Sequence, residues 1–310
     1  MRLFLIWFCF IFFFSEGHSQ GTENSPLSAP FYTRQIELRH ENDFLIYTDR
    51  YYTSGSYIEY RKLSEKGLSE NRKEQLIFRF EHLLYTPTNI LSEDLNDYDR
   101  PYAGYLGISG ESFITFKTQA AHFRFAVGVT GPMSLAENFQ YLFHNTGGIS
   151  TPPWESQIKN NFHFNIYGGY LFEWELLPNP FSVHVALSPE VALGTRDVYI
   201  DHGVKFFFGQ RNALSNTMAY QQLGSVEKEF FFSFNFTYRN VIHNALLEGH
   251  LIQDDSPLLI ESKREAYFYG LDGYYRTNRH DFKVGCQYST RETASTVFHM
   301  FVTLSVARRF

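Results

Sequence analysis

The 310-residue sequence contains only two cysteines, Cys9 and Cys286, which cannot form a disulfide-rich scaffold or a cysteine-rich zinc site. It has no excess of basic residues, and a net charge of −6 gives no indication of a nucleic-acid partner. Beyond the first 14 residues it also lacks any apolar run of about 18 residues, which excludes a helical membrane protein. Aromatic residues, by contrast, make up 18% of the chain. That content is too high for a disordered chain and is typical of strands and membrane interfaces.

The N-terminus has the pattern of an export signal. Arg2 precedes an unbroken apolar stretch at residues 3–14, and residues 15–20 are polar. The apolar stretch is too short to span a bilayer, so we predict a signal peptide at residues 1–20, with an uncleaved anchor as the alternative. The remainder, 21–310, is expected to form a single domain.

The C-terminal segment alternates strictly between apolar and polar positions. Its apolar register consists of Phe298, Met300, Val302, Leu304, Val306 and Phe310. A second run, starting at Phe230, alternates in the same way, with Phe231 as an exception. Strands of about ten residues that are apolar outside and polar inside are typical of transmembrane β-barrels. A soluble β-sandwich also alternates, but the export signal, the aromatic content and the terminal Phe310 favour the barrel.

The fold prediction is therefore an all-β, antiparallel transmembrane barrel of about twelve strands. We place the strands at 33–43, 52–63, 73–84, 102–115, 119–131, 160–175, 180–193, 200–211, 226–250, 263–276, 280–290 and 296–310. Splitting the ninth strand at Arg239-Asn240 would give thirteen, but single-chain bacterial barrels have even numbers. If both termini are periplasmic, the loops 44–51, 85–101 and 132–159 are extracellular.

The longest of these loops contains one helical window, from Ser134 to His144. Ser134 and Glu137 have the spacing of a capping box, and Gly147-Gly148 can end the helix. Glu137, Gln140 and His144 are expected to share a face. A histidine there can serve as a general base, although a loop histidine is more often inert.

A second polar cluster lies where the first strand reaches the same rim. Asn42 continues the outward register of Ile36 and Leu38, whereas Asp43 points the other way or into the following loop. A carboxylate beside an amide oxygen suits a hard cation such as Ca²⁺. An ordinary polar strand end is the alternative.

Several segments together resemble the lipid A 3′-O-deacylase (LpxR) family of outer-membrane enzymes. They are Glu41-Asn-Asp43, Thr48-Asp-Arg-Tyr-Tyr-Thr-Ser-Gly55, Asp99-Arg-Pro-Tyr-Ala-Gly104, Gly131-Pro132, Gln140 with His144, and Pro153-Trp154 followed by Gln157. The resemblance implies a twelve-stranded barrel with its site between the outer wall and a loop helix. It also implies Ca²⁺-dependent ester hydrolysis, similar to that of secreted phospholipase A2.

The resemblance also implies a role for each matching residue. His144 would activate water, and Gln140 would orient His144 or the substrate. Asp43 would hold Ca²⁺, with Asn42 beside it at the metal and shaping the oxyanion site, and Thr53 matches a further site position. The implied substrate is lipid A of lipopolysaccharide. The site would face the outer leaflet of a Gram-negative outer membrane, and we expect a monomer in contact with outer-membrane lipid.

The chain departs from the family at two positions. Ser92 stands about where relatives carry a lysine, and residues 145–153 contain no acid where relatives carry a glutamate after the histidine. Two other functions remain open. One is a phospholipase or acyltransferase barrel with a Ser/His pair, and the other is a structural or porin-like barrel. In the latter case, inward charges such as Glu37, Arg39, Glu229 and Arg239 would fill a narrow interior.

Overall fold

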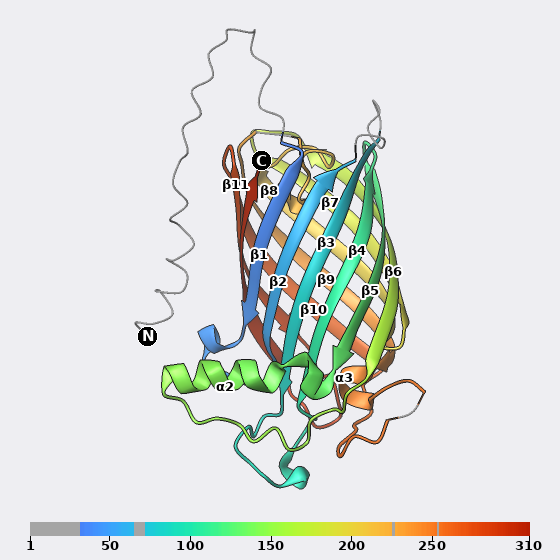
Figure 1. The fold of residues 1–310 in the computed structure, drawn as a ribbon. Coiled ribbons are helices and arrows are strands. Elements are labelled where there is room, and N and C mark those ends of the chain that lie inside the picture. The colour runs from blue at the N-terminus through green and yellow to red at the C-terminus, as the bar shows by residue number, and fades with distance from the viewer. Residues whose placement is uncertain (1–31, 65–71, 225–226, 253) are drawn as a thin grey trace.

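The computed structural model describes residues 32–64, 72–224, 227–252 and 254–310. The predicted signal peptide lies outside these residues. Twelve antiparallel strands form a closed barrel in which β1 pairs with β12 (Figure 1). This confirms the predicted fold class.

Each predicted strand has a counterpart, and the ninth is continuous through Arg239-Asn240 but ends six residues earlier than predicted. The strands are β1 (Arg34–Asn42), β2 (Tyr51–Leu63), β3 (Lys73–Thr86), β4 (Ala103–Thr115), β5 (Gln119–Thr130), β6 (Phe162–Leu177), β7 (Ser182–Gly194), β8 (Asp197–Gln210), β9 (Glu229–Asn244), β10 (Glu265–Arg276), β11 (His280–Ser289) and β12 (His299–Arg309).

The described helices lie between strands and are short. They are η2 (Phe44–Ile46), η4 (Leu95–Asp97), η5 (Gly131–Ser134), α2 (Ala136–Gly147), η6 (Met218–Tyr220) and α3 (Ala245–Glu248). None of these helices combines the length and apolar character needed to cross a membrane.

The alternation seen in the sequence sorts side chains to the two faces of the wall. Ile36 is 45% exposed on the outside, whereas the neighbouring Glu37 is 2% exposed on the inside. Phe231, the exception in β9, faces inward and stacks on Tyr274, with ring centroids 4.5 Å apart. It packs there against Leu214 and Met218, which lie in the β8–β9 connection. The exception therefore belongs to an internal apolar cluster near the end of the barrel that carries the N-terminus of β1.

Charged side chains occupy the interior of the wall in opposed pairs. Arg61 forms ion pairs with Glu37 and Glu59, and Arg79 lies 2.7 Å from Glu59. The other inward charges named from the sequence are also paired: Arg39 with Glu41, Glu229 with Arg276, and Arg239 with Asp201. The named residues therefore form ion pairs with oppositely charged neighbours.

Candidate active site

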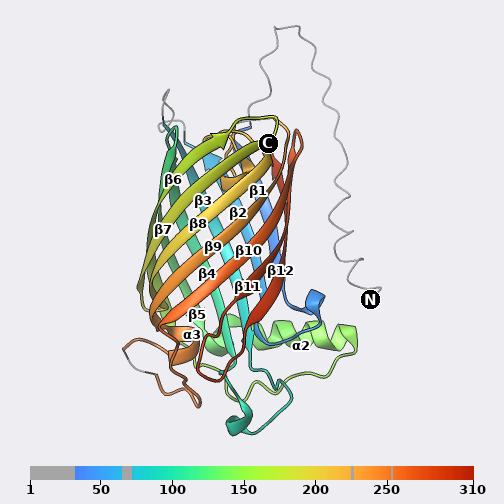
Figure 2. The ribbon, with the colours of Figure 1, turned by 180° about the vertical axis from the view of Figure 1, so that it is seen from behind.

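The three loops predicted to be extracellular all lie at one end of the barrel. There α2 lies crosswise on the outer side of the wall, close to η2 and to the ends of β1 and β2 (Figures 1 and 2). Two aromatic contacts hold it in place. Phe139 meets His82 of β3, with ring centroids 5.3 Å apart, and Phe143 meets Phe44 of η2 at 6.1 Å. A loop helix is therefore fixed against the outside of the sheet.

The helix begins differently from the prediction. Ser134 belongs to the preceding η5 and its hydroxyl donates to the Gly131 carbonyl at 2.6 Å, so the predicted capping box is wrong. Leu135, in a left-handed conformation, occupies the N-cap. The C-terminal prediction is confirmed, because Gly148 ends α2 with φ 68°.

Close approach of the helix to the wall depends on Gly104 in β4. A Cβ atom at Gly104 would lie 2.1 Å from the Ser134 hydroxyl and 2.3 Å from the Ala136 Cβ. Only glycine leaves room for η5 and α2 at this distance. This accounts for the glycine that ends the Asp99–Gly104 motif.

The helix directs two of the three predicted residues toward the wall. Gln140 and His144 are each 3% exposed, but Glu137 is exposed, so the prediction that it shares their face is wrong. Trp154, from the segment after α2, donates from Nε1 to the Gln140 Oε1 at 2.8 Å. Because the Gln140 oxygen faces Trp154, the Gln140 Nε2 group points away from Trp154.

Asp49, in the loop between η2 and β2, is where these groups meet. Its Oδ2 lies 3.0 Å from His144 Nε2, and its Oδ1 accepts from Gln140 Nε2 at 3.2 Å and from the Thr53 hydroxyl at 2.8 Å. Three of the predicted site residues thus contact one carboxylate. Asp49 was part of the Thr48–Gly55 motif but carried no predicted role, because only the folded chain brings it to His144.

Thr53 reaches this cluster because of a β-bulge. In the pairing of β2 with β3, Tyr52 opposes Tyr85 and Ser54 opposes Leu84, so Thr53 is the extra residue. In the regular alternation Thr53 would face the barrel interior with Tyr57. The bulge turns its side chain outward, toward Asp49 and the Thr86 hydroxyl at 3.2 Å.

Asn42 and Asp43 lie beside this cluster at the end of β1. The Asn42 Oδ1 accepts from the Phe44 amide at 2.6 Å. Asp43 turns into the loop, where its Oδ2 accepts from the Thr48 hydroxyl at 2.7 Å and from the Arg50 amide at 3.0 Å. Its other carboxylate oxygen, Oδ1, is buried without a hydrogen-bond partner.

Burial, together with the nearby Asp49 charge, raises the pKa of Asp43 to about 7, although its hydrogen bonds with Arg50 and Thr48 act in the opposite direction. A cation next to the unpartnered oxygen would offset both costs. No group of three His, Cys, Asp or Glu side chains with metal-ligand geometry occurs among the described residues. The donors fit Ca²⁺, which also accepts amide, carbonyl and water oxygens, better than they fit Zn²⁺.

Both nitrogens of the His144 ring are engaged. Nε2 faces Asp49, and Nδ1 lies 2.6 Å from the Ser150 carbonyl. Burial lowers the pKa of His144, but the hydrogen bonds to Asp49 and to Ser150 outweigh burial and hold this pKa above its usual value. The ring is therefore close to an acid that stabilises its charged form.

The backbone around Asp49 is strained. Tyr47 and Tyr51 both have positive φ angles, 62° and 59°. Each such bulky residue costs on the order of 1–3 kcal/mol, a cost that tends to occur at functional sites. The two strained residues flank the short segment that places Asp49 in contact with α2.

Two residues of the matching motifs, Glu41 and Arg100, have partners outside the Asp49 cluster. Glu41 faces inward and accepts from the Tyr52 hydroxyl at 2.6 Å. Arg100 is fully buried, forms an ion pair with Glu292 and lies over the Tyr85 ring. These residues support the rim of the barrel rather than the cluster around Asp49.

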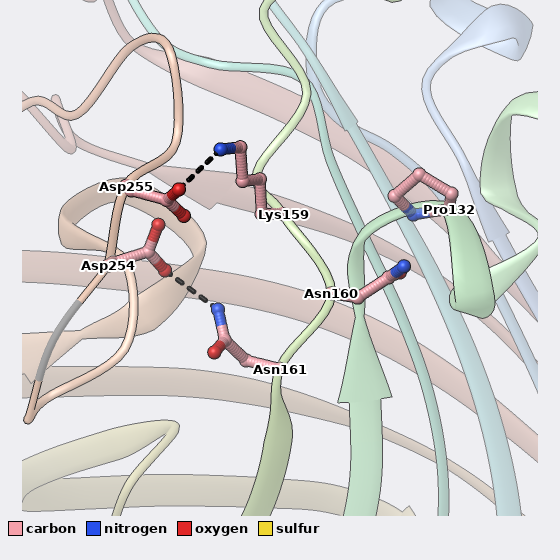
Figure 3. Close-up of a pocket in the computed structure, with 6 residues that line it drawn as sticks. All are labelled: Pro132, Lys159, Asn160, Asn161, Asp254 and Asp255. Carbon is pink, nitrogen blue, oxygen red and sulfur yellow. Dashed lines mark hydrogen bonds and ion pairs between the residues drawn. The ribbon is translucent and has the colours of Figure 1, made fainter.

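A separate hollow of about 420 Å³ lies at the same rim, lined by Pro132, Lys159, Asn160, Asn161, Asp254 and Asp255. Figure 3 shows Lys159 and Asn161 pointing toward the two aspartates. The distances are 2.6 Å from Lys159 Nζ to Asp255 and 2.8 Å from Asn161 Nδ2 to Asp254. These polar groups already satisfy one another, and no residue of the Asp49 cluster lines the hollow.

The two helices next to the Asp49 cluster, α2 and η2, carry exposed apolar side chains. On α2, Leu142 is 65% exposed and Tyr141 57%, and in and after η2, Leu45 is 43% and Tyr47 92% exposed. They continue the apolar outer surface of the strands, of which Ile36 is a part. We call these exposed residues of α2 and η2 the apolar surround of the polar cluster.

The family model described as outer membrane protein LpxR matches residues 4–310 of the chain. Among solved structures, LpxR from Salmonella typhimurium is similar, with a TM-score of 0.77 and 16% sequence identity. That match covers 89% of this chain and 100% of the Salmonella chain. The translocator domain of the autotransporter NalP from Neisseria meningitidis has a TM-score of 0.46 and 8% identity, covering 92% of this chain and 90% of that one. No curated protein sequence matches the chain.

Proposed function

The chain belongs to the LpxR family of outer membrane proteins, and from this premise we propose that it is a lipid A 3′-O-deacylase of the Gram-negative outer membrane. It hydrolyses the ester that joins the 3′-acyloxyacyl group to the lipid A sugar. The observation that supports this most directly is the contact between His144 of α2 and Asp49 of the loop between η2 and β2. It creates a basic group on the outside of a barrel, where an acylated lipid of the outer leaflet can reach it.

In this proposal His144 acts as the general base. A ring nitrogen accepts a proton from water as the water oxygen attacks the ester carbonyl. The same proton then goes to the sugar oxygen as the carbon–oxygen bond breaks, which releases the fatty acid and leaves a sugar hydroxyl. Gln140 and Thr53 fix the position of Asp49 relative to α2, so the base is oriented before the substrate binds.

Ca²⁺ is the proposed cofactor, and Asp43 with the adjacent Asn42 would hold it. When bound, the ion supplies stabilisation of the negative charge that develops on the carbonyl oxygen. The buried, unpartnered Oδ1 of Asp43 supports this assignment because an anionic oxygen without a donor is costly unless a cation is present. The Asn42 Oδ1 accepts from the Phe44 amide, which fixes the orientation of this side chain beside Asp43.

The apolar surround of the cluster supports a lipid substrate. Exposed side chains such as Leu142 and Tyr141 on α2 are costly in water but compatible with the acyl region of a bilayer. An ester at the junction of head group and acyl chain would lie at the level of the polar cluster. The enzyme is proposed to act as a monomer facing the outer leaflet.

A serine mechanism is the second candidate, because one contact favours it. His40 Nδ1 lies 3.0 Å from the Ser56 hydroxyl on the neighbouring strand. In the part of the chain that the structure describes, an ion pair with a carboxylate is formed by His144 and not by His40. The dyad of His144 and Asp49 is therefore better placed to move a proton.

Mass spectrometry of lipid A from cells with and without the protein tests the proposal. We expect lipid A to lose the mass of the 3′-acyloxyacyl group only when the wild type is present. His144→Ala should leave lipid A intact, whereas Ser56→Ala should retain activity. Unchanged lipid A with a folded, surface-accessible wild type would refute the proposed function, and loss of activity in Ser56→Ala alone would favour the serine mechanism.

A further inference from the structure

The two nitrogens of His144 cannot both keep their present contacts while the ring acts as a base. Nε2 faces the Asp49 carboxylate and Nδ1 faces the Ser150 carbonyl, and both partners accept hydrogen bonds without donating them. The observed arrangement therefore corresponds to an imidazolium that donates twice. When the ring becomes neutral, one nitrogen must lose its proton and leave its acceptor.

The two acceptors are not equal. A carboxylate forms a charge-assisted hydrogen bond, roughly twice as strong as a bond to a neutral carbonyl. Asp49 is also fixed by three further contacts: its Oδ1 accepts from Thr53 and Gln140, and its carbonyl accepts from the Thr86 hydroxyl at 3.2 Å. Ser150, by contrast, lies in the exposed segment that follows α2.

Resting on the proposed function, we infer that Asp49 is the positioning residue of the site. It keeps the proton on Nε2 of His144, so that Nδ1 is the nitrogen that takes the proton from water. In this neutral state the attacking water takes the position beside Nδ1 that the Ser150 carbonyl occupies in the structure. A sequence-distant carboxylate thereby orients the base, because the strained loop between η2 and β2 brings it to α2.

The raised pKa of His144 supports this geometry, because an acceptor charge at 3.0 Å favours the protonated ring. Another acid at this rim, Asp43, interacts electrostatically with Asp49, whereas the groups that shift the pKa of His144 are Asp49 and the Ser150 carbonyl. The Asp49 side chain is 26% exposed, so solvent partly screens the electrostatic interaction between its carboxylate and His144.

The experiment uses the full-length protein folded in detergent and compares the wild type with Asp49→Asn, Asp49→Glu and the control Asp97→Asn. Asp97 is an exposed acid of the neighbouring loop that accepts from Ser92. Histidine labelled in the ring is followed by NMR across pH, with His144→Asn used to assign the His144 signal. Lipid A turnover is measured on the same samples.

We expect the wild-type His144 ring, when neutral, to carry its proton on Nε2. In Asp49→Asn the pKa of His144 should fall by about one unit or more, and kcat should fall on the order of 10²- to 10⁴-fold with little change in KM. Asp49→Glu should recover part of both, and Asp97→Asn should match the wild type.

The outcomes separate the two proposals. If Asp49→Asn loses turnover while the His144 pKa and tautomer stay as in the wild type, Asp49 has only a structural role and the inference is wrong. A wild-type neutral ring protonated on Nδ1 overturns it as well. If the wild type itself leaves lipid A intact, the proposed function fails, but the NMR titration still decides whether Asp49 holds Nε2.

Discussion

Two carboxylates of this barrel, Glu173 inside the wall and Asp43 at the outer rim, are both deeply buried but differently partnered. Arg211 contacts the two oxygens of Glu173 at 2.8 and 2.7 Å, and the Tyr220 hydroxyl donates to one of them at 2.9 Å. Asp43 has donors on one oxygen only. Among the described residues it is the one buried carboxylate with an unpartnered oxygen.

The difference indicates how a single barrel separates stability from chemistry. Paired charges inside the wall compensate one another, so they hold strands in register and have little capacity left for a substrate. At the rim, strain at Tyr47 and Tyr51, the unpartnered oxygen of Asp43 and the raised pKa of His144 occur together. Costs of this kind persist where a bound ion or substrate offsets them.

The largest effect on turnover is expected from His144→Ala. Loss of a general base should lower kcat by about 10²- to 10⁴-fold, while the barrel folds normally because the helix lies outside the wall. The measurement is lipid A turnover per folded molecule, with folding followed by heat-modifiable migration on a gel. The control is His202→Ala on β8, a strand on the opposite side of the closed barrel from β2. Wild-type turnover by His144→Ala would show that His144 is not the general base, and the proposed chemical difference between the rim and the interior would lose its main support.

Asp43→Ala and removal of Ca²⁺ should come next. A chelator should stop turnover and added Ca²⁺ should restore it in the wild type, since a hard cation requires an anionic oxygen ligand. Asp43→Ala should lose on the order of 10²- to 10³-fold, as for loss of an oxyanion-stabilising group, and excess Ca²⁺ should not restore it fully. Full activity in the presence of chelator would remove the ion from the mechanism.

The pH dependence should be smaller and should have one sign. His144 must be neutral to act as a base, and its pKa lies above the usual value of 6.5. Turnover should therefore fall as pH drops through this raised pKa, by about tenfold for each further pH unit, and should be constant well above it. A kcat profile across pH on folded protein provides the test. A midpoint of the acid limb well below pH 6.5 would contradict the influence of Asp49.

The interior should respond in the opposite way. Arg211→Leu leaves Glu173 buried without its guanidinium, which is expected to cost about 3–5 kcal/mol of unfolding free energy but to leave kcat of the folded fraction unchanged. Urea unfolding in detergent micelles, combined with turnover per folded molecule, measures both. A selective loss of kcat with unchanged stability would mean that the interior network communicates with the rim.

The sequence alone determined the barrel because its period of two is a local property. Once Phe298, Met300 and Val302 face lipid, the residues between them must face inward, and backbone groups in lipid require the sheet to close. Asn42, Asp43, Thr53, Gln140 and His144 were predicted as site residues from motif resemblance, and their roles stay a prediction. The capping box and the shared face of Glu137 were wrong because the η5 turn and the close contact at Gly104 shift where α2 begins.

Only the tertiary structure decided which of these residues meet. A bulge of one residue turns Thr53 outward, and two residues with positive φ direct Asp49 toward a helix almost a hundred positions later in the chain. Alternation along one strand contains no information about contacts between an outer wall and a distant loop. Periodic burial therefore fixed the barrel from the sequence, whereas the pairing of His144 with Asp49 depends on how the rim packs.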